Sequence, residues 1–285
     1  MERSENIIGI DLGATNVRGA VVNEEGLSGL TSKRIRSNGT VEEVLQDMYA
    51  VIDPLAGSDI AAIGIGVPSV VDTEKGIVYD VQNIPSWKEV PLKQILENKY
   101  HVPVYVNNDA NCFALGEYYF GKGIGEDHLI GLTIGTGLGA GIIIHRRLYA
   151  GANCGAGEFG TVEYLDHCYE YYCSGQFFEN VYQVDGAVVF DRAAKGDPEA
   201  LRMYAEMGIH LGKAIKMILY TYDPSLIILG GSVRNAYAYF QKTMREEMSS
   251  FAFGKSLEQL RIVVSELDNS AILGAAALYY DAGRR

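Results

Sequence analysis

Cysteine is scarce in this sequence, and no cysteine-rich framework is present. Four cysteines in 285 residues fit a reduced compartment better than a disulfide-stapled secreted domain. The opening residues, MERSENIIGID, contain no long apolar segment and no small-residue cleavage site, which argues against a secretory signal. No run elsewhere is long and apolar enough to cross a bilayer. These absences predict a cytoplasmic protein without a membrane partner.

Basic residues are also in the minority. Lysine and arginine number 24 against 36 aspartates and glutamates, a formal net charge of −12. Broad binding to nucleic acids or anionic membranes needs an excess of positive charge, so the composition argues against both. The five histidines show no paired metal-ligand spacing, and neither a Walker A motif nor a Gly-x-Ser-x-Gly elbow occurs. We therefore do not expect a catalytic metal held by histidines, a P-loop nucleotide site or a hydrolase of the nucleophile-elbow type.

Glycine, by contrast, follows a repeated pattern. IIGIDLGATNVRGAVV occupies residues 7–22 and LIGLTIGTGLGAGIII residues 129–144, and three glycines of each coincide when the two are aligned without gaps. Each stretch is typical of a strand, a tight turn and a second strand. Glycine permits positive φ at the turn and lets backbone N–H groups approach a ligand, which suits a phosphate. Either stretch alone is equally well explained as an ordinary buried hairpin, but the repetition indicates two related halves.

The rest of the chain alternates strands and helices. About two domains are expected for 285 residues with 48% hydrophobic content. We expect strands at 60–67, 103–106, 225–229 and 262–265, and helices at 41–56, 91–100, 110–120 and 270–280, with two or three more between 175 and 222. Residue 91 is a proline expected at the first helical position, and segments 72–90 and 146–172 have no expected regular structure. The alternation predicts an α/β protein with buried sheets.

Four positions just past strand ends carry the candidate chemistry: Asp11, Asp109, Gly135 and Gly230. Ligands of α/β sheets bind beyond the carboxyl ends of strands, so we expect these residues to face one cleft between the halves. Phosphoryl transfer depends on positioning and charge neutralisation. It uses one carboxylate to accept the proton of a hydroxyl and another to hold hydrated magnesium. Asp109 fits the first role, although an Asn-Asp pair at such a junction is more commonly a helix cap.

The ordered set of motifs resembles the ROK group of sugar kinases within the actin-like ATPase superfamily. DLGATNVR at 11–18 is similar to that family's first phosphate motif, GIGVP at 64–68 to its next strand, NDAN at 108–111 to its catalytic segment, TIGTGLGAG at 133–141 to its second phosphate motif and LGGS at 229–232 to its adenosine motif. Residues 151–158, GANCGAGE, resemble the segment whose glutamate holds sugar hydroxyls. The resemblance covers essentially the whole chain.

This resemblance implies a fold, an activity and a set of site residues. The implied fold is a two-lobed, ribonuclease H-like α/β fold with duplicated domains and a central cleft, divided into a small domain, 1–118 with the helix 270–285, and a large domain, 119–269. The implied activity is ATP-dependent phosphorylation of a sugar 6-hydroxyl, most readily that of glucose, with Asp109 as the base and Mg²⁺ associated with Asp11 through water. The implied substrate residues are Asn108, Glu158, Thr161 and Glu179. The implied nucleotide residues are Asp11, Gly13, Thr15, Asn16, Arg18, Gly135, Thr136, Gly137, Gly230 and Gly231.

The sequence departs from the family pattern at two places. Thr161 stands where many members have a histidine that binds sugar and a structural zinc, and it offers a hydroxyl instead. The family's cysteine cluster is reduced to Cys168 and Cys173 with His167 nearby. Tetrahedral zinc needs four ligands, so we do not expect a structural zinc ion. We expect the packing of the insert's tyrosines, 164, 169, 171 and 172, to hold the insert together instead. Glu179 is equally well explained as a solvated residue at a helix start.

Several alternatives remain open. One alternative is the same reaction on another sugar, such as N-acetylmannosamine, N-acetylglucosamine, allose or fructose. A sugar-responsive regulator of the same family is a different class; such proteins resemble the kinases with an added helix-turn-helix, which we do not expect here because the first strand begins by Ile7 and no basic recognition helix follows. A catalytically silent sugar-binding protein is disfavoured by Asp109 and the two phosphate turns. Dimers are common among similar proteins, so a homodimer is expected.

Overall fold

The computed structural model describes residues 5–13, 15–81 and 83–283, so Ala14 of the first phosphate motif lies outside the described residues. Two compact units make up the chain. The first contains Met1–Gly125, Gly141–Ala156 and Leu267–Arg285, and the second contains Glu126–Ala140 and Gly157–Glu266. The division into 1–118 with 270–285 and 119–269 stays a prediction.

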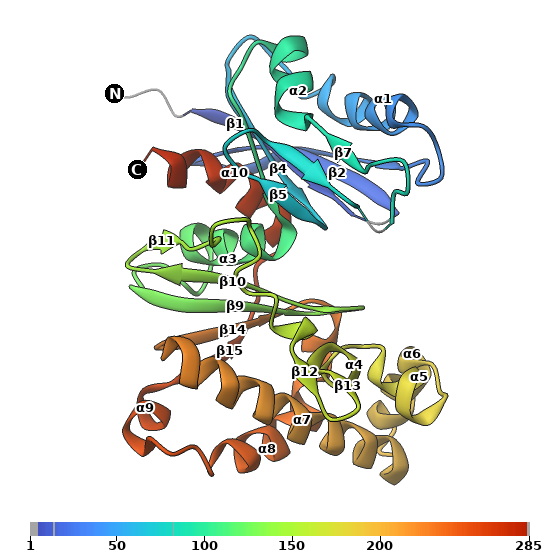
Figure 1. Cartoon of the computed structure of the whole chain (residues 1–285), viewed down its shortest axis with the longest axis vertical. Coiled ribbons are helices and arrows are strands. Elements are labelled where there is room, and N and C mark those ends of the chain that lie inside the picture. The colour runs from blue at the N-terminus through green and yellow to red at the C-terminus, as the bar shows by residue number, and fades with distance from the viewer. Residues whose placement is uncertain (1–4, 14, 82, 284–285) are drawn as a thin grey trace. The chain divides into compact units, whose positions relative to one another are not determined.

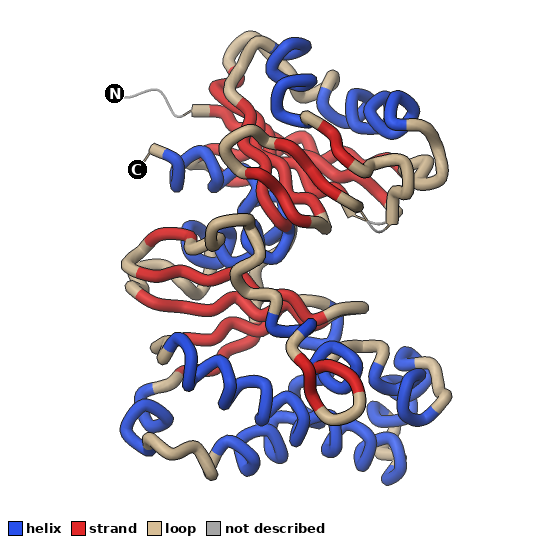
Figure 2. The backbone as a smooth tube through the Cα atoms, in the orientation of Figure 1, coloured by secondary structure: helices blue, strands red, loops and turns tan. Residues whose placement is uncertain are grey.

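Two five-stranded sheets share one strand order (Figures 1 and 2). The first is ordered β3 (Gly26–Arg34), β2 (Asn16–Asn23), β1 (Asn6–Leu12), β4 (Ile60–Val67) and β8 (Val104–Asn108). The second is ordered β11 (Arg147–Leu148), β10 (Leu138–Ile144), β9 (His128–Ile134), β14 (Leu226–Gly230) and β15 (Arg261–Val264). In the first sheet β2 is antiparallel to β1 and β3, whereas β1, β4 and β8 are parallel. The repeated strand order confirms the predicted duplicated α/β fold, and both predicted hairpins are present.

Alternation along β1 builds a core on each face of the first sheet. Ile8 and Ile10 belong to one cluster with α1 (Val41–Ile52) and α2 (Leu92–Tyr100). Ile7 belongs to another with α10 (Ser270–Ala282), as expected when successive side chains point to opposite faces. Figure 1 shows α1 and α2 together on one face of this sheet and α10 on the other. Thr40 and Glu43 form a capping box at the start of α1, which stabilises that end of the helix.

Glycines let α10 approach the sheet and α3 (Asp109–Phe120) closely. A Cβ at Gly64 of β4 would overlap the carbonyl of Ala275 in α10. A Cβ at Gly274 would overlap the carbonyl of Cys112 in α3, and one at Gly116 would overlap the carbonyl of Ser270. Because backbone meets backbone at these points, larger side chains have no room. The sheet, α10 and α3 are therefore packed in a fixed arrangement that positions the start of α3.

Several expected elements differ in the structure. The first helix ends at Ile52 rather than near Ala56, since a turn follows at residues 53–55. Pro91 is the N-cap of α2, not its first helical residue. The segment expected to be irregular forms a small sheet of β5 (Val70–Asp72), β6 (Ile77–Tyr79) and β7 (Glu89–Val90). Its strands are two or three residues long, too short for a periodic sequence signal.

The insert of the second unit is also partly regular. It contains the 3-10 helix η1 (Phe159–Thr161), the short hairpin β12 (Glu163–Tyr164) and β13 (His167–Cys168), and helix α4 (Tyr169–Cys173). The remaining helical elements are α5 (Phe177–Tyr182), α6 (Gly186–Ala194), α7 (Pro198–Tyr222), η2 (Ser232–Ala236), α8 (Tyr237–Met248) and α9 (Gly254–Gln259). Gly208 and Gly212 of α7 face α8, where a Cβ would collide with the backbone of Phe240 or Met244. These two glycines therefore allow α7 and α8 to pack closely.

None of the helices described here combines the length and the apolar character that crossing a membrane requires.

Candidate active site

Two of the predicted carboxylates lie at the same edge of the first sheet. Register pairs Asp11 on β1 with Gly66 on β4, and Gly66 with Asn107 on β8. Adjacent strands are about 4.8 Å apart, so Asp11 and Asn107 are separated by roughly 10 Å across the glycine. Asp109 begins α3 two residues after Asn107. A Cβ at Gly66 would lie 3.2 Å from the sulfur of Cys112 and 3.6 Å from the Cα of Asp109. Gly66 thus lets the start of α3 pack against the strand ends.

The buried thiol of Cys112 is influenced by the carboxylates at this edge of the first sheet. Cys112 is fully buried, and this burial raises the pKa of its thiol well above the ordinary value. The charges of Asp109 and Asp11 raise it further, in that order, followed by Cys154. A carboxylate raises a thiol pKa only from nearby. Both carboxylates therefore lie close to one side chain of α3, and Cys112 stays a neutral thiol.

Asn108 rather than Asp109 caps α3. Asn108 is the N-cap, and its side chain accepts a 2.9 Å hydrogen bond from the N–H of Ala110. Asp109 is the first helical residue, and its Oδ1 accepts from the same N–H at 2.8 Å. The amide Nδ2 of Asn108 donates to the carbonyl of Ser69 at 3.4 Å. The capping role that competed with catalysis for Asp109 is thus supplied by its neighbour.

Asp11 is held by Arg18 from the adjacent strand. The two residues are register partners on β1 and β2, and Nη2 of Arg18 is 2.6 Å from Oδ2 of Asp11. The Asp11 side chain is 13% exposed and that of Arg18 is 44% exposed. A charge-assisted hydrogen bond of this length fixes the carboxylate. Asp11 is therefore oriented before any metal ion binds, and Arg18 leaves part of its guanidinium facing solvent.

Backbone hydrogen bonds close both glycine turns. Positive φ was expected, but Gly13, Gly135 and Gly137 all lie outside the left-handed region. The N–H of Gly13 closes its turn onto the carbonyl of Asn16 at 2.9 Å, and the N–H of Gly135 closes the other onto the carbonyl of Gly137 at 3.0 Å. The carbonyl of Thr15 accepts from the N–H of Ile35. In both turns the first glycine's N–H is thus used inside the protein.

A cavity of about 400 Å³ lies beside the second turn, within the second unit. Gly135 and Thr136 line one part of it, and a Cβ at Gly135 would meet no described atom within 4 Å. The other lining residues come from α5 and α6 with the residues just before each of them, from α7 and from η2: Gly175, Gln176, Phe178, Glu179, Asp185, Gly186, Ala187, Phe190, Tyr204, Ser232, Val233 and Ala236. Its volume is within the range of small-molecule sites, and mixed aromatic and polar walls are typical of them. The cavity therefore has the size and lining of a small-molecule site, with the second glycine turn at its edge.

Sequence patterns missed the aromatic walls of this cavity. Phe178 and Tyr204 pack against each other with ring centroids 4.7 Å apart. Phe190 contacts Tyr239, which in turn contacts Tyr204. These rings come from four different helices, and single aromatic residues on amphipathic helices give no signal beyond ordinary core packing.

Gly230 and Gly231 carry the chain from β14 into η2 beside this cavity. Gly230 is the last residue of β14 and pairs with Thr133 of β9. Gly231 has φ +76°, and a Cβ there would overlap the carbonyl of Ile134. Here a glycine is needed both for its left-handed backbone and for close approach. The adjoining Ser232 and Val233 line the cavity.

The predicted sugar residues of the second unit occupy two places. Glu158 precedes η1, and Thr161 closes that turn by donating its hydroxyl to the carbonyl of Glu158 at 2.8 Å. Glu158 is exposed as a residue, yet protein atoms around its carboxyl group raise its pKa, and the charge of Glu170 adds to this effect. Glu179 instead lines the cavity that contains Gly135 and Thr136.

The tyrosine-rich insert packs as a cluster of rings. Tyr164 stacks on Tyr169 with centroids 4.4 Å apart, and its hydroxyl is 3.0 Å from Nδ1 of His210. His167 stacks on Tyr171 at 3.8 Å. Cys173 is buried, which raises the pKa of its thiol. Among the residues that the structure describes, no three histidine, cysteine, aspartate or glutamate side chains form a metal-binding group.

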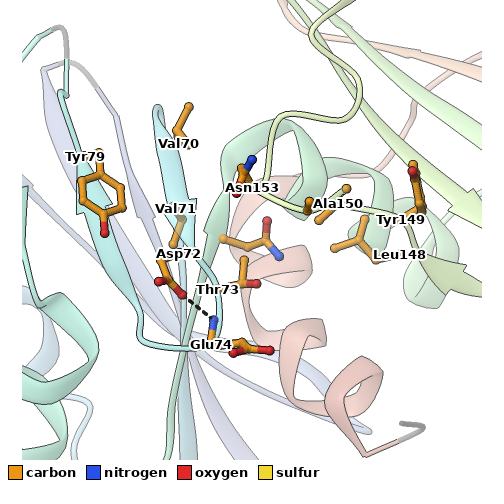
Figure 3. A pocket seen from close by; sticks show the side chains of 13 residues that line it. Val70, Val71, Asp72, Thr73, Glu74, Tyr79, Leu148, Tyr149, Ala150 and Asn153 are labelled. Carbon is orange, nitrogen blue, oxygen red and sulfur yellow. Dashed lines mark hydrogen bonds between the residues drawn. The ribbon is translucent and has the colours of Figure 1, made fainter.

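A second cavity, of about 650 Å³, lies within the first unit (Figure 3). Residues 70–74 with Tyr79 and the loop 148–153 face each other across it, and Asn107 also lines it. Asp72 accepts a hydrogen bond from the N–H of Glu74 there, which keeps the β5–β6 turn closed. None of the predicted site residues lines this cavity.

The duplicated sheets, each beginning with a hairpin that carries a glycine turn, define the fold of the actin-like ATPases. The sequence model of the ROK family matches residues 7–282, and the chain belongs to this family. The glucokinase of Thermotoga maritima is 29% identical over 95% of this chain and 96% of its own. A ROK family glucokinase from Streptomyces griseus, solved with glucose and AMPPNP, is 29% identical with a TM-score of 0.81, covering 96% of this chain and 98% of that one. The xylose repressor of Bacillus subtilis is also 29% identical, over 96% of this chain and 77% of its own. The protein is thus a sugar kinase or a regulator.

Proposed function

We propose that this protein is an ATP-dependent hexose kinase that phosphorylates the 6-hydroxyl of a sugar, with glucose as the preferred acceptor. The observation that carries the proposal is the pair of carboxylates at one sheet edge. Asp11 is fixed by Arg18, and Asp109 begins α3 directly after its N-cap residue, Asn108. A site with one oriented acid and a second acid at a helix start supplies what phosphoryl transfer requires. The similarity to glucokinases supports the choice of glucose.

Each residue has a proposed task. Asp109 accepts the proton of the sugar 6-hydroxyl as that oxygen attacks. Asp11 holds a hydrated Mg²⁺ ion through water, and the Arg18 guanidinium keeps its carboxylate in place. When bound, Mg-ATP supplies the transferable phosphoryl group. The amides of Thr136 and Gly137 in the second turn donate hydrogen bonds that offset the negative charge of the phosphates.

Sugar recognition is assigned to polar side chains of both units. Asn108 has its Nδ2 and Oδ1 at the start of α3. Glu158 in its ionised form accepts hydrogen bonds from sugar hydroxyls. The Oγ1 of Thr161 also keeps a lone pair for a sugar hydroxyl, because its own O–H donates a hydrogen bond to the Glu158 carbonyl. Glu179 stays a proposed sugar ligand, although it shares its cavity with the phosphate turn. Gly13, Thr15 and Asn16 of the first turn, with Gly230 and Gly231, complete the proposed nucleotide set.

A panel assay tests the proposal against the regulator alternative. We expect ADP release from Mg-ATP with glucose to give the highest kcat/KM among glucose, N-acetylmannosamine, N-acetylglucosamine, allose and fructose. Calorimetric titration with the same sugars, without nucleotide, measures binding separately. Sugar binding without ADP release for any hexose would favour a regulator or a silent binding protein. A cytoplasmic homodimer also stays a proposal, which size-exclusion chromatography with light scattering tests for the oligomer.

A further inference from the structure

A short segment, residues 170–176, holds the second phosphate turn by three hydrogen bonds. The N–H of Gly175 donates to the carbonyl of Gly135 at 2.7 Å. Nε2 of Gln176 donates to the carbonyl of Thr136 at 2.7 Å. In the opposite direction, the N–H of Leu138 donates to Oε2 of Glu170 at 2.9 Å. Turn and segment belong to the same unit, so three successive peptide groups of the turn are bound from one neighbour.

These bonds decide where the turn's N–H groups point. A trans peptide is planar, and its N–H points opposite to its carbonyl. Since the carbonyls of Gly135 and Thr136 are directed at residues 175 and 176, the N–H groups of Thr136 and Gly137 point away from that segment. Two successive N–H groups on one side of a turn form the kind of concave site in which proteins bind phosphate.

Glu170 places a negative charge next to the turn, where that charge alone would repel a phosphate. A Cβ at Gly137 would lie 2.6 Å from Oε2 of Glu170, so the carboxylate packs directly against the back of the turn. It accepts the N–H of Leu138 in a charge-assisted hydrogen bond, which is stronger than a neutral one. Losing this acceptor would leave the end of the turn untethered.

We propose that Glu170 is a positioning residue for the nucleotide: by holding the N–H of Leu138, it fixes the turn so that the amides of Thr136 and Gly137 meet the phosphates. The inference rests on the proposed function, because it specifies how that turn binds Mg-ATP. Glu170 belongs to none of the motifs that resemble the family. Its role follows from the bond to Leu138.

Two substitutions separate the hydrogen bond from the charge. Glu170→Gln keeps an oxygen that accepts the Leu138 N–H, whereas Glu170→Ala removes the acceptor. We expect Glu170→Ala to weaken Mg-ATP binding, measured by calorimetry, by roughly tenfold, the size of a lost charge-assisted hydrogen bond. Glu170→Gln should stay within about threefold of the wild type. Glu163→Ala, an exposed glutamate of the same insert, is the matched control and should bind as the wild type does.

Amide hydrogen exchange of the peptide that contains residues 135–138 gives a readout without nucleotide. It should become faster in Glu170→Ala and stay unchanged in Glu170→Gln and Glu163→Ala, because the tether is lost only in the first. Gly137→Ala is an independent variant, since its Cβ would displace the Glu170 carboxylate from the other side; we expect a similar loss of Mg-ATP affinity.

The outcomes separate two kinds of failure. Wild-type protein that does not bind Mg-ATP would contradict the proposed function, and this inference with it. Wild-type binding together with unchanged affinity and exchange in Glu170→Ala would overturn the positioning role alone. Equal losses in Glu170→Gln and Glu170→Ala would also overturn it, because the hydrogen bond would then not be what matters.

Discussion

Asp11 and Arg18 face each other as register partners on adjacent antiparallel strands, with 2.6 Å between Oδ2 and Nη2. The pair links the two strands of the first glycine hairpin close to its turn. Its carboxylate is largely shielded while its guanidinium is partly open to solvent. An acid oriented in this way has little conformational freedom to lose when a hydrated cation binds, which favours binding.

Asp11→Asn should therefore raise the magnesium concentration needed for half-maximal activity. The amide keeps the shape of the side chain but removes the negative charge that attracts the hydrated ion. We expect an increase of about tenfold, the effect of a lost interaction of roughly 1.4 kcal/mol. A magnesium titration at saturating ATP and sugar measures it. Asp80→Asn is the control, because Asp80 is an exposed residue of the same unit, and an unchanged magnesium requirement in Asp11→Asn would remove Asp11 from the metal site.

Asp109→Asn should nearly abolish turnover. The amide does not accept the proton of the attacking hydroxyl, and general base catalysis contributes about 10²–10⁴ in rate. Asn108 still caps α3 in this variant, so thermal unfolding should be little changed. The kcat for ADP release is the measurement. Near-normal kcat in a folded Asp109→Asn protein would show that the base assignment is wrong.

Sugar binding should weaken as the pH is lowered, and the weakening should begin at a higher pH than it would for a glutamate of ordinary pKa. Burial of the carboxyl group and then the charge of Glu170 raise the pKa of Glu158 above its ordinary value of 4.5. The ionised form accepts sugar hydroxyls, so the KM for sugar should rise as the pH falls through the raised pKa. Glu170→Gln should move this rise to lower pH, because it removes a like charge.

The raised pKa of Glu158 has the opposite effect on folding stability, which falls with rising pH while sugar binding improves. The folded protein binds a proton at Glu158 more tightly than the unfolded chain does, so stability is lost as the pH rises through the folded-state pKa. Glu158→Gln should therefore raise Tm at neutral pH while it impairs sugar binding. Steady-state KM profiles and thermal unfolding over the same pH series check both effects. A sugar KM that is flat with pH in the wild type would speak against Glu158 as a ligand.

Filling the cavity beside the second turn should block the nucleotide. Ala187 lines this cavity, whereas the next residue of α6, Val188, does not and is 50% exposed. We expect Ala187→Trp to weaken Mg-ATP binding at least about tenfold, because the indole would occupy space that a nucleoside needs. Val188→Trp is the matched control on the same helix. Equal Mg-ATP affinities of the two variants, measured by calorimetry, would place the nucleotide elsewhere.

Gly274→Ala should destabilise the first unit. Its Cβ would overlap the carbonyl of Cys112 and lie 2.9 Å from the N–H nitrogen of Gly116. Overpacking of this kind costs about 1–3 kcal/mol and sometimes more. Gly254→Ala is the control, because no described atom lies within 4 Å of a Cβ there. Urea unfolding measures both, and equal midpoints would mean that α3 and α10 are less tightly packed than the structure shows.

Local patterns in the sequence were sufficient for much of the fold. The two hairpins, the strand at 60–67, the helix that starts after Asn108 and the last helix follow from hydrophobic periodicity and turn residues, and all are present. The short strands β5–β7 were not predicted, because strands of two or three residues are defined by their partners rather than by their own composition.

Residue order alone established which motifs this chain carries: the two glycine turns, Asp109 after a buried strand, and a segment with too few cysteines for the family's zinc site. Only the folded structure shows which residue caps α3, which amides of the second turn are already bonded, and which aromatic rings line the cavity beside that turn. The reason is physical. A strand or a turn is specified by neighbours a few residues away, whereas Glu170 meets Leu138 and Gly274 meets Cys112 across long stretches of chain. Such contacts depend on how the elements pack together, which no short window of sequence contains.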